Sequence, residues 1–444
     1  MSNLIGLTEP KTIFESIIKR SITAILYILI YNIIYTRYLS ITWGYFGYNL
    51  NDVRLSYFII TIIIAYFPIV FFRGILRISS FFSILIYILG YVPIILTLMY
   101  NSHSNSNIIL SFQLSIMLGM ILLFLIDKIN FNIIFKIKTK KKLPFYLIHI
   151  ITLGLSLYIL FIFKGNMRLV NFTDVYELRS SNKALVSEDL TGYFIMWLGY
   201  CLYPLYFTLG LANRKLLYSF IGILGEIFLY TITGSKASLL EPVIILIFFL
   251  ILNIKSKFSF FQLIVFSILI LYLLILTGTN PMTLLIGSIF FMRTLSIGGL
   301  LSSQYLDFFQ HHNMTYYSHI NIINLITNNY PYGNESLGDV LGYYYYSKNV
   351  NSNAIFWATD GIAAMGQYGV IIISIIVMLF FAFLNSNFKR TNNLFMPLIF
   401  TPAILTILNA SFFTTLLSGG LLLLVIMMLM FDIPYTGKNL ESNN

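Results

Sequence analysis

The stretch ISSFFSILIYILGYVPIILTLMY, which runs from Ile78 to Tyr100, contains no charged side chain. An α-helix needs about 20 predominantly apolar residues to cross the hydrocarbon core of a bilayer, so this stretch is long enough to do so. Similar apolar runs recur along the chain of 444 residues, which is 58% hydrophobic and only 10% charged. Soluble proteins carry roughly 25% charged residues. The composition therefore excludes a soluble globular protein and predicts a polytopic membrane protein.

The apolar runs predict an all-α fold with about twelve transmembrane helices. They lie near residues 19–36, 55–72, 78–100, 107–126, 145–163, 190–210, 214–233, 238–253, 259–277, 361–385, 394–410 and 415–431. The sequence shows no internal repeat and no soluble domain, so residues 1–444 are expected to form a single integral membrane domain.

The formal charge of +11 indicates how the chain is oriented. With a cytoplasmic N-terminus, most of the 27 Lys and Arg residues fall in cytoplasmic segments, as the positive-inside rule requires, and most acidic residues fall outside. An even number of crossings then places the C-terminus in the cytoplasm as well. The Lys-rich stretch from Lys136 to Lys142 is expected to anchor this topology rather than to bind nucleic acid.

Two segments between spans are long enough to carry function, residues 164–189 and residues 278–360. Both are expected on the outer side of the membrane. Residues 283–300 are apolar enough for a helix, but a crossing there would invert everything downstream. We therefore expect an interfacial or re-entrant helix near residues 283–300, followed by short helices under an aqueous outer face.

Motifs for nucleotide, dinucleotide and zinc chemistry are absent from the sequence, which has no Walker A stretch, no glycine fingerprint and no HExxH. Its single cysteine, Cys201, excludes an internal disulfide and a cysteine-built metal site. His311, His312 and His319 are either metal ligands or polar residues that contact solvent or substrate. Adjacent residues on a helix point apart, so no metal and no cofactor are expected.

Three cations lie near the expected outer ends of helices. Arg179 ends the stretch DVYELR (174–179), Lys236 lies in TGSKASLL (233–240), and Arg293 lies inside the apolar outer helix. A cation in such a position is costly unless it is paired or binds an anionic ligand. One hypothesis is that the three converge on a diphosphate, with arginine supplying bidentate contacts and lysine a point charge.

Arg293 also has structural explanations. It could form a salt bridge with an outer carboxylate such as Asp307 or Asp360, or extend to the lipid headgroups. Glu226, inside the seventh span, is costly in a bilayer and is expected to face the bundle interior. It is either a buried structural group or part of a proton path. No second acid is expected within a span.

Aromatic and amide side chains are concentrated in the outer segment. The aromatic residues are Tyr316, Tyr317, Tyr330, Tyr332, Tyr343 to Tyr346 and Trp357, and the amides are Asn321, Asn324, Asn328, Asn329, Asn334, Asn351 and Asn353. An interfacial aromatic belt explains part of this pattern. Carbohydrate is the alternative, because sugar rings stack on aromatic faces while their hydroxyls bond amides. Glu335, Asp339 and Asp360 are candidate bases for a sugar hydroxyl, and Asp360 is the best placed because it lies where the chain re-enters the membrane.

Several short stretches together resemble the O-antigen polymerase family, the oligosaccharide repeat-unit polymerases of bacterial envelopes. They are DVYELR ending at Arg179, TGSKASLL around Lys236, Arg293 followed by YLDFF from Tyr305, NSNAIFWATDGIAAMGQYG from Asn351, and LLSGGLL from Leu416. Their order and spacing along the expected spans carry the resemblance.

The resemblance implies a metal-independent membrane glycosyltransferase of the C-type architecture, in the bacterial inner membrane with a large periplasmic loop. Such an enzyme joins repeat units that are linked to undecaprenyl diphosphate. Its partners are the lipid-linked oligosaccharide, membrane lipid and a chain-length regulator protein, and it binds no nucleic acid.

By the same resemblance, Arg179, Lys236 and Arg293 bind the diphosphate, and Arg293 also stabilises the charge that develops as it leaves. Tyr305 and Trp357 are expected to contact substrate. Asp360 or a loop histidine, for which we name His312 first, takes the acceptor proton.

Two alternatives stay open. The O-antigen ligase family shares the architecture but passes the finished glycan to a lipid A core. A flippase for lipid-linked oligosaccharides also has about twelve helices, but it would be expected to show charges distributed through its spans and two similar halves. Here the outer segment 278–360 interrupts any division of the chain into two similar halves.

Overall fold

The computed structural model describes residues 10–129, 142–171, 174–187, 190–254, 258–276, 280–347, 350–388 and 395–434. Within these residues the chain is almost entirely helical, as the sequence predicts. Its two strands, β1 (Leu143–Pro144) and β2 (Phe431–Asp432), form one short parallel pair. Residues 136–141 of the Lys-rich stretch lie outside the described residues.

The helices follow one another closely along the chain. Those of the first half are α1 (Pro10–Ile34), α2 (Ser40–Thr42), α3 (Leu55–Tyr66), α4 (Ile78–Ile86), α5 (Val92–Asn101), α6 (Ser106–Leu125), α7 (Tyr146–Ile162), α8 (Val175–Ser187), α9 (Thr191–Trp197), α10 (Tyr203–Asn213), α11 (Leu216–Thr233) and α12 (Lys236–Asn253). Those of the second half are α13 (Phe260–Leu276), α14 (Pro281–Gly287), α15 (Ile297–Phe309), α16 (Asn321–Thr327), α17 (Leu337–Tyr346), α18 (Ala363–Asn387), α19 (Phe395–Ile399), α20 (Thr401–Ile407), α21 (Phe412–Leu417) and α22 (Leu421–Met430).

Short π and 3₁₀ turns join several of these helices into longer rods. The π segments are η1 (Tyr35–Leu39), η4 (Tyr87–Tyr91), η6 (Leu198–Leu202), η7 (Ser288–Ser296) and η8 (Trp357–Ile362), and the 3₁₀ turns are η2 (Gly44–Phe46), η3 (Phe67–Phe71) and η5 (Ile126–Lys128). Joined in this way, nine helices among the described residues are long and apolar enough to cross a membrane. They are Ile17–Thr42, Ile78–Asn101, Ser106–Lys128, Thr191–Asn213, Leu216–Thr233, Lys236–Asn253, Pro281–Phe309, Trp357–Asn387 and Phe412–Met430. Leu55–Phe71, Tyr146–Ile162 and Phe260–Leu276 are apolar but shorter. By length and composition the chain is a multi-pass membrane protein, and the count of about twelve crossings stays a prediction.

Large apolar side chains on several helices point outward. Phe161 on α7 is 76% exposed, Leu216 on α11 is 85% exposed and Leu274 on α13 is 61% exposed. Contiguous apolar surface of this kind is unfavourable in water and favourable against lipid. These helix faces therefore fit the surface that meets the hydrocarbon.

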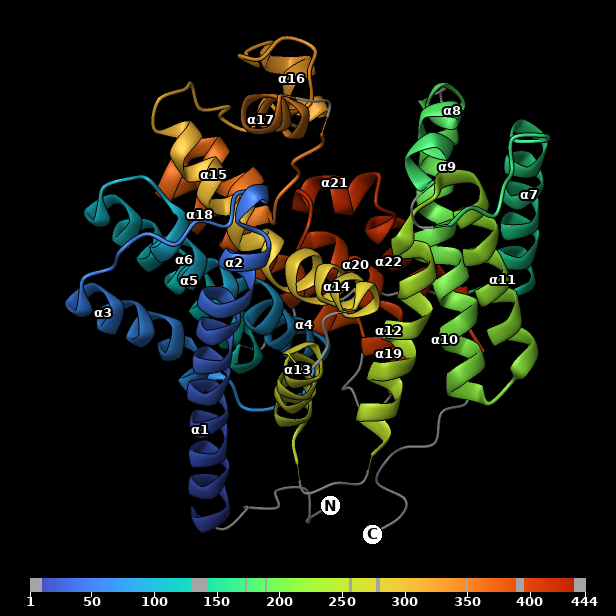
Figure 1. The fold of residues 1–444 in the computed structure, drawn as a ribbon. Coiled ribbons are helices and arrows are strands. Elements are labelled where there is room, and N and C mark those ends of the chain that lie inside the picture. The colour runs from blue at the N-terminus through green and yellow to red at the C-terminus, as the bar shows by residue number, and fades with distance from the viewer. Residues whose placement is uncertain are drawn as a thin grey trace.

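The two ends of the molecule differ. In Figure 1, α16 and α17 form a cap at one end, and α8 reaches the same end from the other side of the molecule. The beginning of α1, the end of α12 and the beginning of α13 lie at the opposite end (Figure 1). The two long segments that the sequence singles out, 164–189 and 278–360, therefore contribute to the same end of the fold.

Small residues let some helices pack closely. A Cβ atom at Gly222 on α11 would lie 2.7 Å from the backbone nitrogen of Phe207, and one at Gly225 would lie 2.2 Å from the ring of Tyr203. Only glycine fits at such approaches, and close packing through small residues is typical of membrane helices. The pair α10 and α11 is therefore held by backbone proximity rather than by interlocking large side chains.

Residues 283–300, for which the sequence predicts an interfacial or re-entrant helix, are helical and lie within a longer rod, Pro281–Phe309, in which η7 joins α14 to α15. The rod is long and apolar enough to cross a membrane, and its interfacial or re-entrant placement stays a prediction. Another stretch differs from the sequence-based expectation. The run near 394–410, which the sequence predicts as one span, is two short helices, α19 and α20. Pro402 lies in the first turn of α20 and has no N–H to continue the hydrogen bonding of α19.

Candidate functional site

A cavity of about 790 Å³ lies between the cap and the helix bundle. It is lined from above by α16, the segment that follows it and the start of α17, and from below by α21 (Figure 1). The lining mixes polar and apolar side chains and includes one carboxylate, that of the predicted candidate base Glu335. Its amides are Asn321, Asn324, Asn334, Asn351 and Asn353, and its aromatic rings include Tyr193 and Tyr330. Amides and phenols in this arrangement match the hydrogen-bonding groups of a sugar.

The segment that carries Asp360 enters the bundle and turns back. Within the helical region Trp357–Asn387, Met365 and Gly366 have non-helical backbone angles, and Gly366 has φ of +61°. The segments before and after this turn are in contact, since a Cβ atom at Gly369 would lie 2.2 Å from the carbonyl oxygen of Gly361. Asp360 thus lies on a short re-entrant helix, η8, beside α18. Glycine at 366 permits the turn because its left-handed conformation is unfavourable for other residues.

Asp360 and His319 are hydrogen-bonded to each other beside the cavity. His319 Nε2 lies 3.1 Å from Asp360 Oδ1, and the two side chains are 6% and 0% exposed. His319 lines the cavity, and Asp360 lies behind it, next to Thr359 and Ser411 of the lining.

Further hydrogen bonds fix the carboxylate and the ring. The Ser411 hydroxyl donates to Asp360 Oδ1 at 2.6 Å, and the Phe412 N–H donates to Oδ2 at 2.6 Å. Because these donors identify Asp360 as an acceptor, His319 Nε2 carries the proton between them, and in the neutral ring Nδ1 is the free acceptor. Nδ1 lies 2.8 Å from the Thr315 hydroxyl. The arrangement is that of a basic nitrogen whose ring is oriented by a buried carboxylate.

Tyr330 adds an unpartnered donor to the same cavity. Its ring lines the cavity, and its buried hydroxyl has no hydrogen-bond partner among the residues that the structure describes. Burial raises the pKa of Tyr330, so the phenol stays neutral and able to donate at physiological pH. Tyr332, its neighbour, instead donates to the carbonyl of Asn313 at 2.6 Å.

A second cavity, of about 460 Å³, adjoins the first. Tyr193 and Ser418 line both. The second is more apolar, since Val186, Ile195, Met196 and Leu229 contribute to it. A polar and an apolar chamber that share a wall fit the two halves of an amphiphilic substrate.

Arg179 and Lys236 lie near the second cavity at the turn between α11 and α12. Arg179 Nη2 donates to the carbonyl of Gly234 at 3.0 Å, and Lys236 begins α12 two residues later. Gly234 has φ of +57°, and a Cβ atom there would lie 2.8 Å from Val175 of α8. The structure therefore brings these two predicted cations to one turn, which also supplies Thr233 and Ser235 to the cavity lining.

Arg293 lies elsewhere. It is exposed on η7, with its guanidinium 5.6 Å from the centre of the Phe46 ring, and it lines neither cavity. The predicted salt bridge to Asp307 is not seen among the described residues, and Asp307 accepts hydrogen bonds from Ser102 and Ser104. Arg293 is thus placed by a cation–π contact rather than by a carboxylate.

The other predicted site residues also lie away from the cavity lining. His312 is exposed and stacks on Phe308 with ring centres 3.8 Å apart. Tyr305 is fully buried and donates to the Ser352 carbonyl at 3.2 Å. Trp357 is fully buried and donates to the hydroxyl of Ser374 at 2.9 Å.

Glu241 corrects one expectation. Glu226 on α11 and Glu241 on α12 are 1% and 4% exposed and close enough for their charges to interact, so a second acid does accompany Glu226 inside the bundle. Within the described part of the chain, neither carboxylate oxygen of Glu226 forms a hydrogen bond of ordinary geometry, and the Ser238 hydroxyl of α12 lies close by. The expectation of no second acid within a span is therefore wrong, because Glu241 lies in the second turn of α12, where it is buried.

Among the described residues no group of three or more His, Cys, Asp or Glu side chains could hold a metal ion. Comparison of the chain with protein-family models, with curated proteins and with solved structures finds no match.

Proposed function

We propose that the chain is a membrane glycosyltransferase that joins oligosaccharide repeat units carried on undecaprenyl diphosphate, on the outer face of the bacterial inner membrane. The observation that carries the proposal is the buried pair of His319 and Asp360, 3.1 Å apart, beside a cavity of about 790 Å³ rich in asparagine and tyrosine. A flippase needs a path for its cargo through the membrane but has no use for an oriented base at the edge of a sugar-sized cavity.

In the proposed reaction, the hydroxyl of the acceptor sugar enters the cavity and replaces the Thr315 hydroxyl on Nδ1 of His319. The displaced Thr315 hydroxyl then donates its proton to the carbonyl of Ala363, 3.1 Å away. As the acceptor oxygen forms its bond to the anomeric carbon of the donor, its proton passes to Nδ1. Asp360 stabilises the resulting imidazolium through Nε2.

The bond from the anomeric carbon to the diphosphate breaks in the same step, and the diphosphate leaves with the electron pair. Arg179 and Lys236, at the turn beside the apolar cavity, are proposed to hold the diphosphate and stabilise the charge that it gains. The polyprenyl chain would lie along the apolar lining formed by Ile195, Met196 and Leu229. The wall shared by the two cavities, at Tyr193 and Ser418, would then separate sugar from lipid.

The experiment that tests the proposal is deletion of the gene in its host, followed by electrophoresis of the surface polysaccharide. If the protein is a polymerase, the deletion leaves the core lipid bearing a single repeat unit, and the wild-type gene restores a ladder. If the core stays bare, the protein is a flippase or a ligase, and the proposal fails.

Complementation with Arg293→Ala tests whether Arg293 binds the diphosphate, as the resemblance implies. The amount of protein in the membrane is measured for each variant. Loss of the ladder at normal protein level places Arg293 in the reaction. A normal ladder limits Arg293 to its contact with Phe46.

A further inference from the structure

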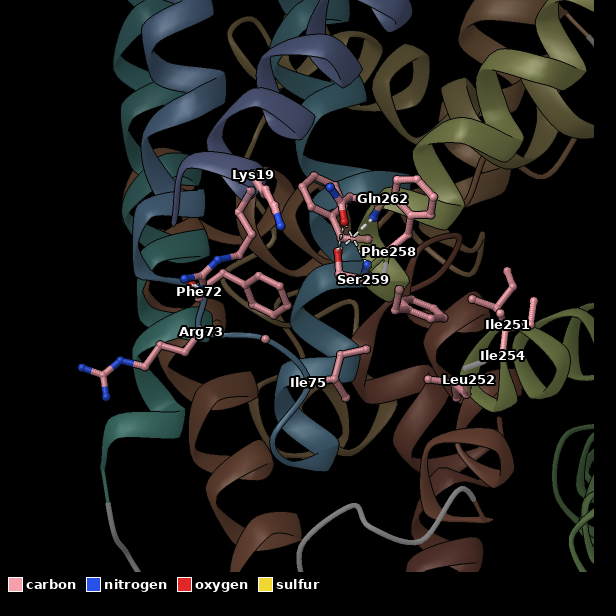
Figure 2. Close-up of a pocket in the computed structure, with 14 residues that line it drawn as sticks. Lys19, Phe72, Arg73, Ile75, Ile251, Leu252, Ile254, Phe258, Ser259 and Gln262 are labelled. Carbon is pink, nitrogen blue, oxygen red and sulfur yellow. Dashed lines mark hydrogen bonds between the residues drawn. The ribbon is translucent and has the colours of Figure 1, made fainter. Parts of the chain in front are cut away.

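A cavity of about 490 Å³ lies at the end of the helices away from the α16–α17 cap. It is bounded by α1, by the connection between η3 and α4, and by the end of α12 and the beginning of α13 (Figure 2). None of the residues assigned to the proposed reaction lines it. Its ligand therefore does not depend on the proposed function.

Three cations line this cavity. Lys19 and Arg20 come from α1, and Arg73 follows η3. Arg20 Nη1 donates to the carbonyl of Phe72 and is close enough to Arg73 for their charges to repel. In Figure 2 the amino group of Lys19 extends toward Ser259 and Gln262, whereas Arg73 extends outward at the rim. No carboxylate is present among the described residues of the lining.

The far wall offers hydrogen-bond donors. Ser259 precedes α13, and its N–H and hydroxyl both lie within hydrogen-bonding distance of Gln262 Oε1, at 2.9 and 3.2 Å. The carboxamide oxygen of Gln262 thus already accepts hydrogen bonds from Ser259, and its amide nitrogen has no partner among the described residues. The positive end of the α13 dipole lies at the same wall and adds to the field of the cations.

The remaining wall is apolar and opens toward the lipid. Phe72 and Phe261 form its floor and are almost fully buried, at 5% and 1% exposed. Ile254 and Phe258 lie at its edge and are 53% and 52% exposed, like the other outward-pointing side chains of α12 and α13. A soluble anion would gain nothing from these apolar groups, whereas acyl chains would pack on them.

We propose that this cavity binds an anionic phospholipid, with Lys19, Arg20 and the Ser259–Gln262 wall receiving the phosphodiester headgroup. Its acyl chains lie against Ile254 and Phe258. Basic pockets between transmembrane helices near a membrane surface are suited to such headgroups.

The test is lipid binding to the purified full-length protein in a neutral detergent. Phosphatidylglycerol and phosphatidylcholine with identical acyl chains are titrated separately, and the bound lipid is counted by native mass spectrometry. The expected result is a preference of at least about tenfold for phosphatidylglycerol. Each charge removed is expected to weaken its binding roughly fivefold, so Lys19→Gln/Arg20→Gln loses about 25-fold.

The double variant Arg214→Gln/Lys215→Gln is the matched control. It removes the same charge from the connection between α10 and α11, and phosphatidylglycerol binding should stay within about twofold of wild type. Lys19→Gln alone changes only an exposed side chain. It should therefore fold normally even if the double variant, which also loses the contact of Arg20 with the Phe72 carbonyl, does not. Equal binding of the two lipids, an equal loss in the control, or displacement of phosphatidylglycerol by millimolar inorganic phosphate would overturn the proposal.

Discussion

His319 Nε2 and Asp360 Oδ1 lie 3.1 Å apart although 41 residues separate them in the chain. The histidine comes from the loop that enters the cap, and the carboxylate from the re-entrant helix η8. The backbone N–H of Thr315 donates to the carbonyl of Ala363 at 2.8 Å and holds the two segments in register. The pair is therefore part of a fixed junction between the cap and the bundle.

His319→Gln is expected to lower polymerising activity by about 100-fold or more, because the acceptor proton then has no base. Activity is measured as chain elongation by purified enzyme with a lipid-linked repeat unit, and thermal unfolding checks that the variant is folded.

His312→Gln is the matched control for that substitution, since His312 is exposed, contacts the rings of Phe308 and Tyr344 and lines neither cavity. It should retain nearly full activity. If His312→Gln abolishes elongation while His319→Gln does not, His312 is the base, as the sequence alone suggested first.

Tyr330→Phe is expected to separate activity from stability. The Tyr330 hydroxyl is buried and has no partner among the described residues, so its removal should leave the melting temperature unchanged or slightly higher. If the hydroxyl receives a hydrogen bond from substrate or donates one, KM for the lipid-linked sugar should rise about tenfold. Steady-state kinetics and thermal unfolding of the same preparation give both values.

Tyr332→Phe provides the opposite pattern. The Tyr332 hydroxyl donates to the Asn313 carbonyl at 2.6 Å, so its loss should cost about 1 kcal/mol of stability and leave KM unchanged. A KM effect from Tyr332→Phe but none from Tyr330→Phe would contradict the assignment of the cavity.

Much of the helical fold was predictable because apolar runs of the right length leave few alternatives in a bilayer. The exceptions follow from single residues. Pro402 divides one expected span into α19 and α20, and the glycine at 366 lets the chain turn back after Asp360. Hydropathy does not register either change, because both stretches stay apolar.

A site residue could be predicted only where its own position in the sequence points to a function. The sequence points to Asp360 because a charged side chain where the chain enters the membrane is costly unless it has a partner or a function. His319 could not be chosen over His311 and His312, since the choice depends on which loop residue meets η8 in space. Glu241 was missed because the packing of α11 against α12, not hydropathy, decides its burial.

Trp357→Phe is expected to destabilise the protein by about 1–3 kcal/mol while KM stays unchanged, because the indole is fully buried and bonds Ser374. Thermal or chemical unfolding in detergent measures the loss. A raised KM at unchanged stability would instead support the substrate contact that the sequence suggested for Trp357.

Glu226→Leu is expected to raise the stability by about 1–3 kcal/mol, because it replaces a buried carboxyl group that forms no hydrogen bond of ordinary geometry to the described residues by an apolar side chain of similar size. Relief of the interaction with Glu241 acts in the same direction. The melting temperature is compared with that of Glu177→Leu on the exposed face of α8, which should change little. A lower stability for Glu226→Leu would mean that Glu226 holds a ligand such as a cation.

The orientation of the cap is tested by cysteine labelling. The single cysteine, Cys201, is buried and is replaced by alanine as the background. Leu325 on α16 is 86% exposed, and Lys215 lies in the connection between α10 and α11 at the other end of the molecule (Figure 1). A membrane-impermeant maleimide should label Leu325→Cys in intact cells and Lys215→Cys only after permeabilisation, because the basic connections stay in the cytoplasm. The reverse pattern would place the cavity and the His319–Asp360 pair on the cytoplasmic side, away from the outer face where the proposed reaction occurs.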